Sequence, residues 1–229
     1  MFLTTSSQIE NEFIRSYFGS WIDQIDPILD DNKNILKYHK KENWERELQA
    51  KYPGWSWAGS GGFRWVLSPN DSYVVKFAHS GSGHSGGVKT NQLESERQLE
   101  FEGFFPKVFF HHPNWEWIVV EKVKPAMPSD LADIFGISKD GAFAFGKLLS
   151  YYVSLIKGND KTAKIRFEEA GMDKSSFDKD YQTLLSNPVF RRLADIAIKL
   201  DLWEYDLSWG NLGINKSGKL VILDSSFSI

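Results

Sequence analysis

The stretch that decides the fold lies between residues 59 and 78 and reads GSGGFRWVLSPNDSYVVKFA. Glycines open this stretch. Two β-branched and aromatic runs follow, at residues 63–67 and 73–78, with a Ser-Pro-Asn-Asp turn between them. Two such runs joined by a short turn predict a β-hairpin. The glycines leave room for backbone N–H groups to approach an anion, although a hairpin that only needs flexible residues accounts for them as well.

The chain around this hairpin predicts an α+β fold, in which a small antiparallel sheet precedes a mainly helical region. The predicted strands span residues 54–58, 63–67, 73–78, 107–111, 116–123, 212–215 and 219–224. The predicted helices span residues 6–26, 32–51 after a break at 30–32, 89–102 and, in several pieces, 129–200. The breaks within the last region are predicted at Gly136, Gly158-Asn159, Gly171 and Pro188. We divide the chain into an N-terminal helical extension (1–53), a sheet domain (54–124) and a helical domain (125–229).

Composition bounds the kind of protein. The 229 residues, 41% of them hydrophobic, suffice for one large domain or two small lobes. The absence of cysteine excludes disulfides, thiol nucleophiles and cysteine-bound zinc. A net charge of −3 gives no general attraction to nucleic acid or to an anionic membrane. Residues 1–8 lack a signal-peptide pattern, and no apolar run is long enough to span a membrane. We therefore expect a cytoplasmic protein that binds neither nucleic acid nor a membrane. Its oligomeric state stays open.

A lysine and two glutamates form the first candidate site. Lys76 ends the run Tyr-Val-Val-Lys, and a lysine within an apolar strand needs an anion or a route to solvent because burying it unpaired is costly. An edge-strand lysine that reaches solvent fits the same pattern. The helix that follows carries Glu94 and Glu96. We prefer Glu94 as the partner of Lys76.

Polar residues near the end of the chain form the second candidate site. Asp206 and Asn211 are the first and last residues of the loop DLSWGN, and Asp224 directly follows the apolar run LVIL. An aspartate at the start of such a loop is able to accept a proton, and an asparagine carbonyl suits a hard cation. A turn capped by Asx side chains and an aspartate that simply ends a strand are the structural alternatives.

Taken in order, these features resemble the protein kinase and aminoglycoside phosphotransferase superfamily. The resemblance covers about residues 54–224, with an extra helical stretch inside it. It implies a two-lobed kinase-like fold: a small antiparallel sheet with one key helix in the N-lobe, a truncated and mainly helical C-lobe, and additional N-terminal helices. It implies ATP and Mg²⁺ as cofactors.

The resemblance also assigns roles to residues. Asp206 would be the catalytic base. Lys76, oriented by Glu94, would hold the phosphates, and Asn211 and Asp224 would bind magnesium. The segment 120–123 resembles the hinge that reads adenine through the backbone. The implied nucleotide-binding residues are Gly59, Ser60, Gly61, Gly62, Phe63, Val66, Lys76, Glu121, Val123 and Leu212.

Several residues depart from the family pattern. Arg64 replaces the third glycine of the loop, Glu204-Tyr205 replaces a His-Arg or His-Gly pair, and Ser225-Ser226 replaces Phe-Gly. Ser208 stands where the family places a lysine or histidine. The sequence ends at Ile229, so we expect no activation segment.

The expected activity is transfer of the γ-phosphoryl group of ATP to a hydroxyl, on Ser or Thr of a protein substrate, as in bacterial or phage kinases. A pseudokinase that binds a nucleotide or a protein partner without transfer is the alternative. A second alternative moves AMP or phosphorylates a small molecule. Residues 80–87 are read as a mobile connection with a solvated His84, and the N-terminal helices as a cover for an apolar sheet face or a partner-docking element.

Overall fold

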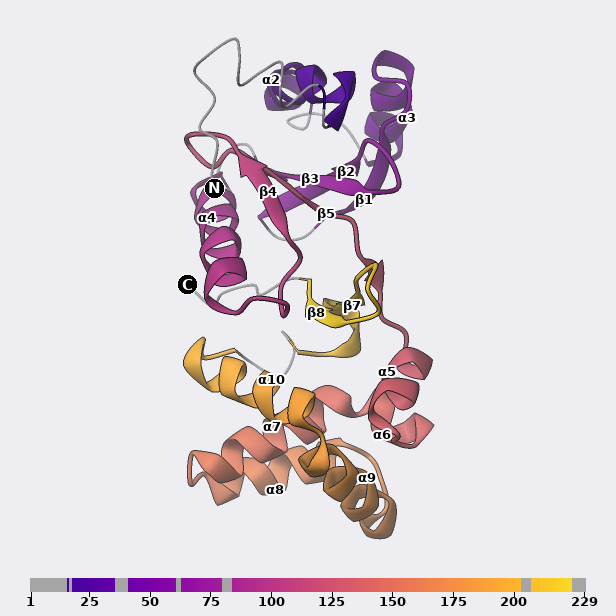
Figure 1. The fold of residues 1–229 in the computed structure, drawn as a ribbon, viewed down its shortest axis with the longest axis vertical. Coiled ribbons are helices and arrows are strands. Elements are labelled where there is room, and N and C mark those ends of the chain that lie inside the picture. The colour runs from indigo at the N-terminus through magenta and orange to yellow at the C-terminus, as the bar shows by residue number, and fades with distance from the viewer. Residues whose placement is uncertain are drawn as a thin grey trace. The chain divides into compact units, whose positions relative to one another are not determined.

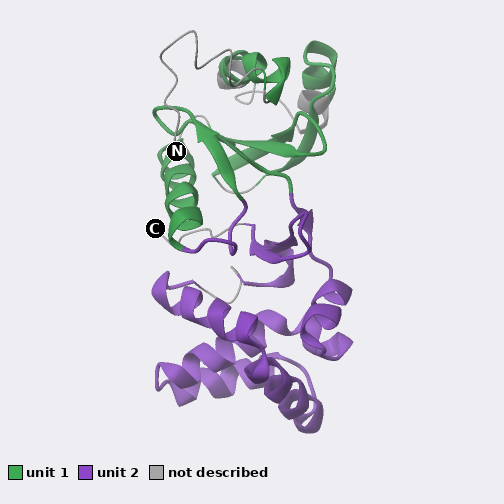
Figure 2. Ribbon diagram, viewed as in Figure 1, with its two compact units in different colours: residues 1–100, 107–122 green, residues 101–106, 123–229 purple. Residues whose placement is uncertain are grey.

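The computed structural model describes residues 16, 18–35, 41–60, 63–79, 84–202 and 207–223. The chain divides into two compact units, of which unit 1 comprises residues 1–100 and 107–122 and unit 2 comprises residues 101–106 and 123–229 (Figure 2). Unit 1 contains a five-stranded antiparallel sheet, and unit 2 is mainly helical. The predicted α+β class is therefore confirmed, while the three-part division at residues 53 and 124 stays a prediction.

The sheet of unit 1 has the strand order β1-β2-β3-β5-β4, with β3 at its centre. The strands are β1 Ser56–Ser60, β2 Arg64–Ser68, β3 Tyr73–Ala78, β4 Val108–His111 and β5 Trp117–Glu121. The predicted hairpin is the β2–β3 pair, and its turn is closed by Asn70, whose Oδ1 accepts the N–H groups of Ser72 and Tyr73 at 2.8 and 3.1 Å. The side chain of Asn70 thus replaces backbone partners that the turn leaves unpaired.

One face of this sheet is apolar and aromatic. Trp65 and Phe77 stack on it with ring centroids 4.1 Å apart, and Val75 and Val119 are fully buried beside them. The N-terminal elements cover this face: the short 3₁₀ helix η1 Ser20–Gln24, α2 Ile25–Ile35 and α3 Lys41–Lys51 (Figure 1). The interpretation of the N-terminal helices as a cover for the sheet is therefore confirmed.

The predicted helix break at residues 30–32 is wrong, because α2 continues to Ile35. Asp31, which was read as part of the break, accepts a hydrogen bond from the hydroxyl of Tyr52 and forms an ion pair with Lys51 at 2.5 Å. These contacts stabilise an aspartate within a helix, where its intrinsic propensity is poor. Tertiary contacts therefore outweigh the local signal. Of the predicted helix 6–26, residues 6–15 and 17 lie outside the described residues.

Helix α4 His84–Glu100 lies against the other face of the sheet and begins five residues earlier than predicted. The interpretation of residues 80–87 as a mobile connection is wrong for residues 84–87, and residues 80–83 lie outside the described part. Gly86 and Gly87 are buried in this first turn. A Cβ atom on Gly86 would lie 2.5 Å from Cδ1 of Phe63, and one on Gly87 would lie 2.5 Å from the carbonyl oxygen of Phe63. These glycines therefore allow close packing of helix on strand.

Unit 2 combines a small sheet with helices packed around one hydrophobic core. Its strands are β6 Lys124–Pro125, β7 Leu212–Ile214 and β8 Leu220–Ile222, in the order β6-β7-β8. Its helices are α5 Pro128–Phe135, α6 Lys139–Phe143, α7 Phe145–Ile156, α8 Asp160–Glu169, α9 Lys174–Ser186, α10 Pro188–Lys199 and the 3₁₀ turn η3 Trp209–Asn211. Gly136 ends α5 with a φ of 67° and Pro188 opens α10, so the breaks predicted at these two positions are confirmed.

The β7–β8 hairpin was predicted as residues 212–215 and 219–224, and it is formed around the side chain of Asn215. The Oδ1 atom of Asn215 accepts the N–H groups of Ser217 and Lys219 at 3.0 and 2.9 Å. In the part of the chain that the structure describes, no helix has the length and apolar character needed to cross a membrane.

Candidate functional site

Lys76 lies on the central strand β3, paired with Val66 of β2 and Ile118 of β5. Side chains alternate between the faces of a strand, so Lys76 lies on the face opposite to Val75 and Phe77. It is only 8% exposed. The sequence thus places a cation in the middle of a sheet, on the face that α4 covers.

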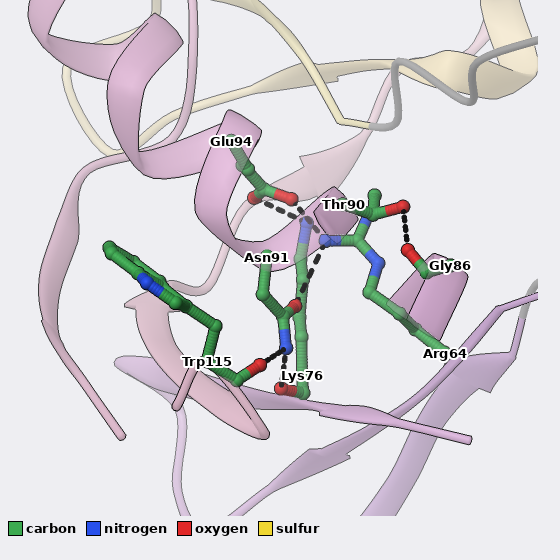
Figure 3. A network of polar contacts seen from close by, with 7 residues as sticks. All are labelled: Arg64, Lys76, Gly86, Thr90, Asn91, Glu94 and Trp115. Atoms are coloured by element: carbon green, nitrogen blue, oxygen red, sulfur yellow. Dashed lines mark hydrogen bonds and ion pairs between the residues drawn. The ribbon is translucent and has the colours of Figure 1, made fainter. Parts of the chain in front are cut away.

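Glu94 of α4 holds this lysine. Its Oε1 atom lies 2.6 Å from Nζ of Lys76, and the glutamate is 4% exposed (Figure 3). Glu96 lies on the exposed side of α4, where it accepts a hydrogen bond from Gln92 at 3.0 Å. Of the two candidate glutamates, it is therefore Glu94 that contacts Lys76, as residues two positions apart on a helix point in very different directions.

Two further polar residues belong to this cluster, and the sequence reading did not find them. Arg64, noted only as a missing glycine, is 6% exposed, and its Nη1 atom lies 2.5 Å from Oε2 of Glu94. Asn91 is fully buried; its Oδ1 atom lies 3.4 Å from Nη1 of Arg64, and its Nδ2 donates to the carbonyl of Trp115 at 2.8 Å. The usable signals were strand alternation, which places Arg64 and Val66 on one face, and the helical spacing of Asn91 and Glu94.

The two cations determine the charge state of Glu94. Complete burial raises the pKa of this carboxyl, but the charges of Lys76 and Arg64 and their hydrogen bonds outweigh burial, so the pKa lies below its usual value. Glu94 is therefore a carboxylate at neutral pH. Lys76 is fixed by an ionised partner rather than by a neutral one.

The predicted glycine-rich loop is described in part. Gly59 and Ser60 end strand β1, while Gly61 and Gly62 lie outside the described residues. Phe63 is half-buried, and its carbonyl accepts the N–H group of His79 at 2.9 Å. Val66 is half-buried and packs with the apolar residues of the Lys76 face, which are Val74, Val108, Ile118 and Val120.

The predicted hinge residues have different surroundings. Glu121 ends β5, and its backbone N–H donates to the carbonyl of Lys107 at 2.8 Å. Val123 belongs to unit 2, where its Cγ1 atom crowds Gly213. The Glu121 N–H is therefore used within unit 1, and the contact of Glu121 and Val123 with adenine stays a prediction.

The remaining predicted site residues belong to unit 2. Leu212 is fully buried in the core of that unit. Asn211 is half-buried at the end of η3, and its backbone carbonyl accepts the N–H group of Leu223 at 2.8 Å. Asp206 and Asp224 lie outside the described residues. Among those that are described, no group of three or more His, Asp or Glu residues is arranged to hold a metal ion. The magnesium site therefore stays a prediction.

Comparison with known proteins gives a likeness to solved structures. No protein-family model matches the chain, and no curated protein matches it. The structure is similar to that in the streptomycin–ATP–APH(2'')-IIa ternary complex, with 15% identity and a TM-score of 0.32 over 82% of this chain and 71% of that chain. It is also similar to the ADP-bound aminoglycoside phosphotransferase APH(2'')-Ib, with 15% identity and a TM-score of 0.31 over 82% and 71% of the two chains.

Proposed function

We propose that this protein binds ATP and transfers its γ-phosphoryl group to a hydroxyl group. The observation that supports the proposal is the buried ion pair of Lys76, on the third strand of an antiparallel sheet, with Glu94, on the following helix. In phosphoryl-transfer enzymes of the kinase type, a β3 lysine held by a helix glutamate contacts the nucleotide phosphates. The glycines of the stretch 59–62, which begins at the end of β1, are consistent with a backbone that approaches phosphate closely.

The proposed chemistry assigns one task to each group. Lys76 binds phosphate oxygens and Glu94 fixes the direction of its amine. Asp206 orients the acceptor hydroxyl and takes its proton while the new P–O bond forms and ADP leaves. Asn211 and Asp224 are the candidate ligands for Mg²⁺, whose charge, when bound, offsets the charge of the phosphates.

We propose the hydroxyl of a Ser or Thr residue in a protein as the acceptor. Two large apolar side chains on helices of unit 2 are exposed, and a protein substrate or partner would cover them. Phe143 and Ile156 are 54% and 50% exposed.

The first experiment is thermal unfolding with ATP, with and without Mg²⁺. A ligand at about 100 times its Kd adds roughly 2.7 kcal/mol of stability, which for a chain of this length raises Tm by about 5–11 °C. We expect Lys76→Met to remove most of this shift. Lys89→Met serves as the matched control, because Lys89 is an exposed lysine on α4 of the same unit.

The second experiment is transfer of label from γ-³²P-ATP to the protein itself and to a mixed protein substrate. Asp206→Ala should slow transfer by about 10²–10⁴-fold and leave the ATP-dependent Tm shift intact. A magnesium-dependent shift without transfer would identify a nucleotide-binding scaffold instead. Absence of any shift with ATP would refute the proposal.

A further inference from the structure

We infer that Arg64 is a positioning residue for Lys76: its guanidinium group holds one carboxylate oxygen of Glu94 so that the other oxygen faces the lysine amine. The inference rests on the proposed function, because it assigns Arg64 a part in orienting the lysine for phosphate. It concerns the position at which the glycine-rich loop has an arginine in place of a glycine.

The contacts of Glu94 are divided between two strands. Oε2 lies 2.5 Å from Nη1 of Arg64 on β2, and Oε1 lies 2.6 Å from Nζ of Lys76 on β3 (Figure 3). The terminal torsion of a glutamate is broad when nothing restrains it. Two cations on different strands restrain it from both sides, so the oxygen that faces Lys76 is fixed.

Arg64 is itself held in place from several directions. Asn91 of α4 approaches its guanidinium and donates to the carbonyl of Trp115, which precedes β5. The residue before it is Phe63, whose carbonyl accepts the N–H group of His79 and whose ring lies close to Gly86. The end of the glycine-rich stretch is therefore coupled to α4 and, through Glu94, to the amine of Lys76.

The charge of Arg64 also affects the pKa of Glu94. Among the described residues, the charged groups around Glu94 are Arg64 on β2 and Lys76 on β3. The buried Arg97 lies one turn further along α4. Strand β5 places the apolar Ile118 beside Lys76. Without Arg64, burial would be opposed mainly by Lys76, so the pKa of Glu94 would rise. The acid limb of the pH dependence of ATP binding should then move to higher pH.

The test compares Arg64→Met with the wild type, with Arg64→Lys as a conservative rescue and Arg46→Met as a control for loss of an exposed arginine in unit 1. The first readout uses no nucleotide: acetylation of Lys76 by an N-hydroxysuccinimide ester, followed by peptide mass spectrometry well below each Tm. We expect Arg64→Met to raise the Lys76 acetylation rate on the order of tenfold. Arg64→Lys should restore much of the protection, and Lys89 should react equally in all variants.

The second readout is the Kd for ATP at several pH values. We expect Arg64→Met to weaken binding on the order of tenfold and Arg64→Lys to recover part of the loss. If Arg64→Met does not fold, Arg64→Gln replaces it with the same expected increase in acetylation.

The outcomes separate this inference from the proposed function. A lower Tm with unchanged Lys76 acetylation and unchanged ATP affinity would show that Arg64 is only structural and would overturn the inference. If the wild type binds no ATP, the proposed function fails, and the acetylation rate of Lys76 alone still decides whether Arg64 positions the amine.

Discussion

The two faces of the sheet in unit 1 bury different kinds of side chain. On one face, Trp65, Val75 and Phe77 pack against the N-terminal helices with apolar contacts. On the other, Lys76 and Arg64 meet Glu94 of α4. The same strands supply both sets of residues through alternation.

The two faces are therefore expected to contribute differently to the protein. Apolar burial is non-directional and tolerates many arrangements, so the aromatic face contributes stability. A buried ion pair contributes little net stability and depends on geometry, so the face with Glu94 is the one expected to have a specific task.

The largest effect is expected on the aromatic face. Phe77→Ala should lower the free energy of unfolding by about 3–5 kcal/mol, because Phe77 is fully buried and stacks on Trp65. Urea denaturation measures the change. Leu99→Ala is the control, since Leu99 is 58% exposed and should change stability by less than about 0.5 kcal/mol. Equal effects of the two substitutions would contradict the proposed packing of the N-terminal helices.

A smaller loss is expected on the charged face. Glu94→Gln should destabilise the protein by about 3 kcal/mol, because it leaves Lys76 and Arg64 buried without their shared carboxylate. Replacing all three residues by Met should recover most of the loss, since a buried ion cluster often has apolar equivalents of similar stability. ATP binding should be weakened in both variants. A triple variant less stable than Glu94→Gln would mean that the ions themselves stabilise the fold.

The pH dependence of stability should report the same carboxylate. The pKa of Glu94 in the folded protein lies below its ordinary value of 4.5, so its contribution is present above that value and is lost as pH falls through the folded pKa. The stability difference between wild type and Glu94→Gln should therefore be largest near neutral pH and shrink in acid. Other carboxyls titrate in both proteins, and the difference removes their effect. A difference that grows in acid would be inconsistent with an ionised Glu94.

Sequence was a good guide where one residue decides a local conformation. The bounds of β3 agree with the predicted residues 73–78, and Gly136 and Pro188 mark helix ends as predicted. Strand position and residue type together pointed to Lys76, and Glu94 was preferred over Glu96 as its partner on the next helix. Local signals such as turns, caps and alternation suffice for these features.

Sequence failed where contacts between distant residues decide. Asp31 was read as part of a helix break because its partners Lys51 and Tyr52 lie in another segment. Arg64 was read as a departure from a glycine pattern, although its position was set by Glu94, thirty residues away. Gly87 was read as a flexible linker residue rather than as a contact. Each error treated a tertiary contact as a local preference.

The smallest effect is expected from the glycines of α4, which test how closely this helix packs on the face that carries Lys76. Gly87→Ala should destabilise the protein by about 1–2 kcal/mol, because overpacking outweighs the gain in helix propensity. The new Cβ would meet the backbone of Phe63 and Ala78, at 2.5 and 2.7 Å, and backbone atoms cannot rotate away.

Gly86→Ala is the matched control for this substitution. The atoms nearest to its Cβ would be ring atoms of the half-buried Phe63, which are able to turn aside, so its effect should be within about 1 kcal/mol of zero. Because α4 carries Glu94, Gly87→Ala should also increase acetylation of Lys76, whereas Gly86→Ala should change it little. Stabilisation by Gly87→Ala, as expected for an exposed helical glycine, would contradict the close packing of α4 on Phe63 and Ala78.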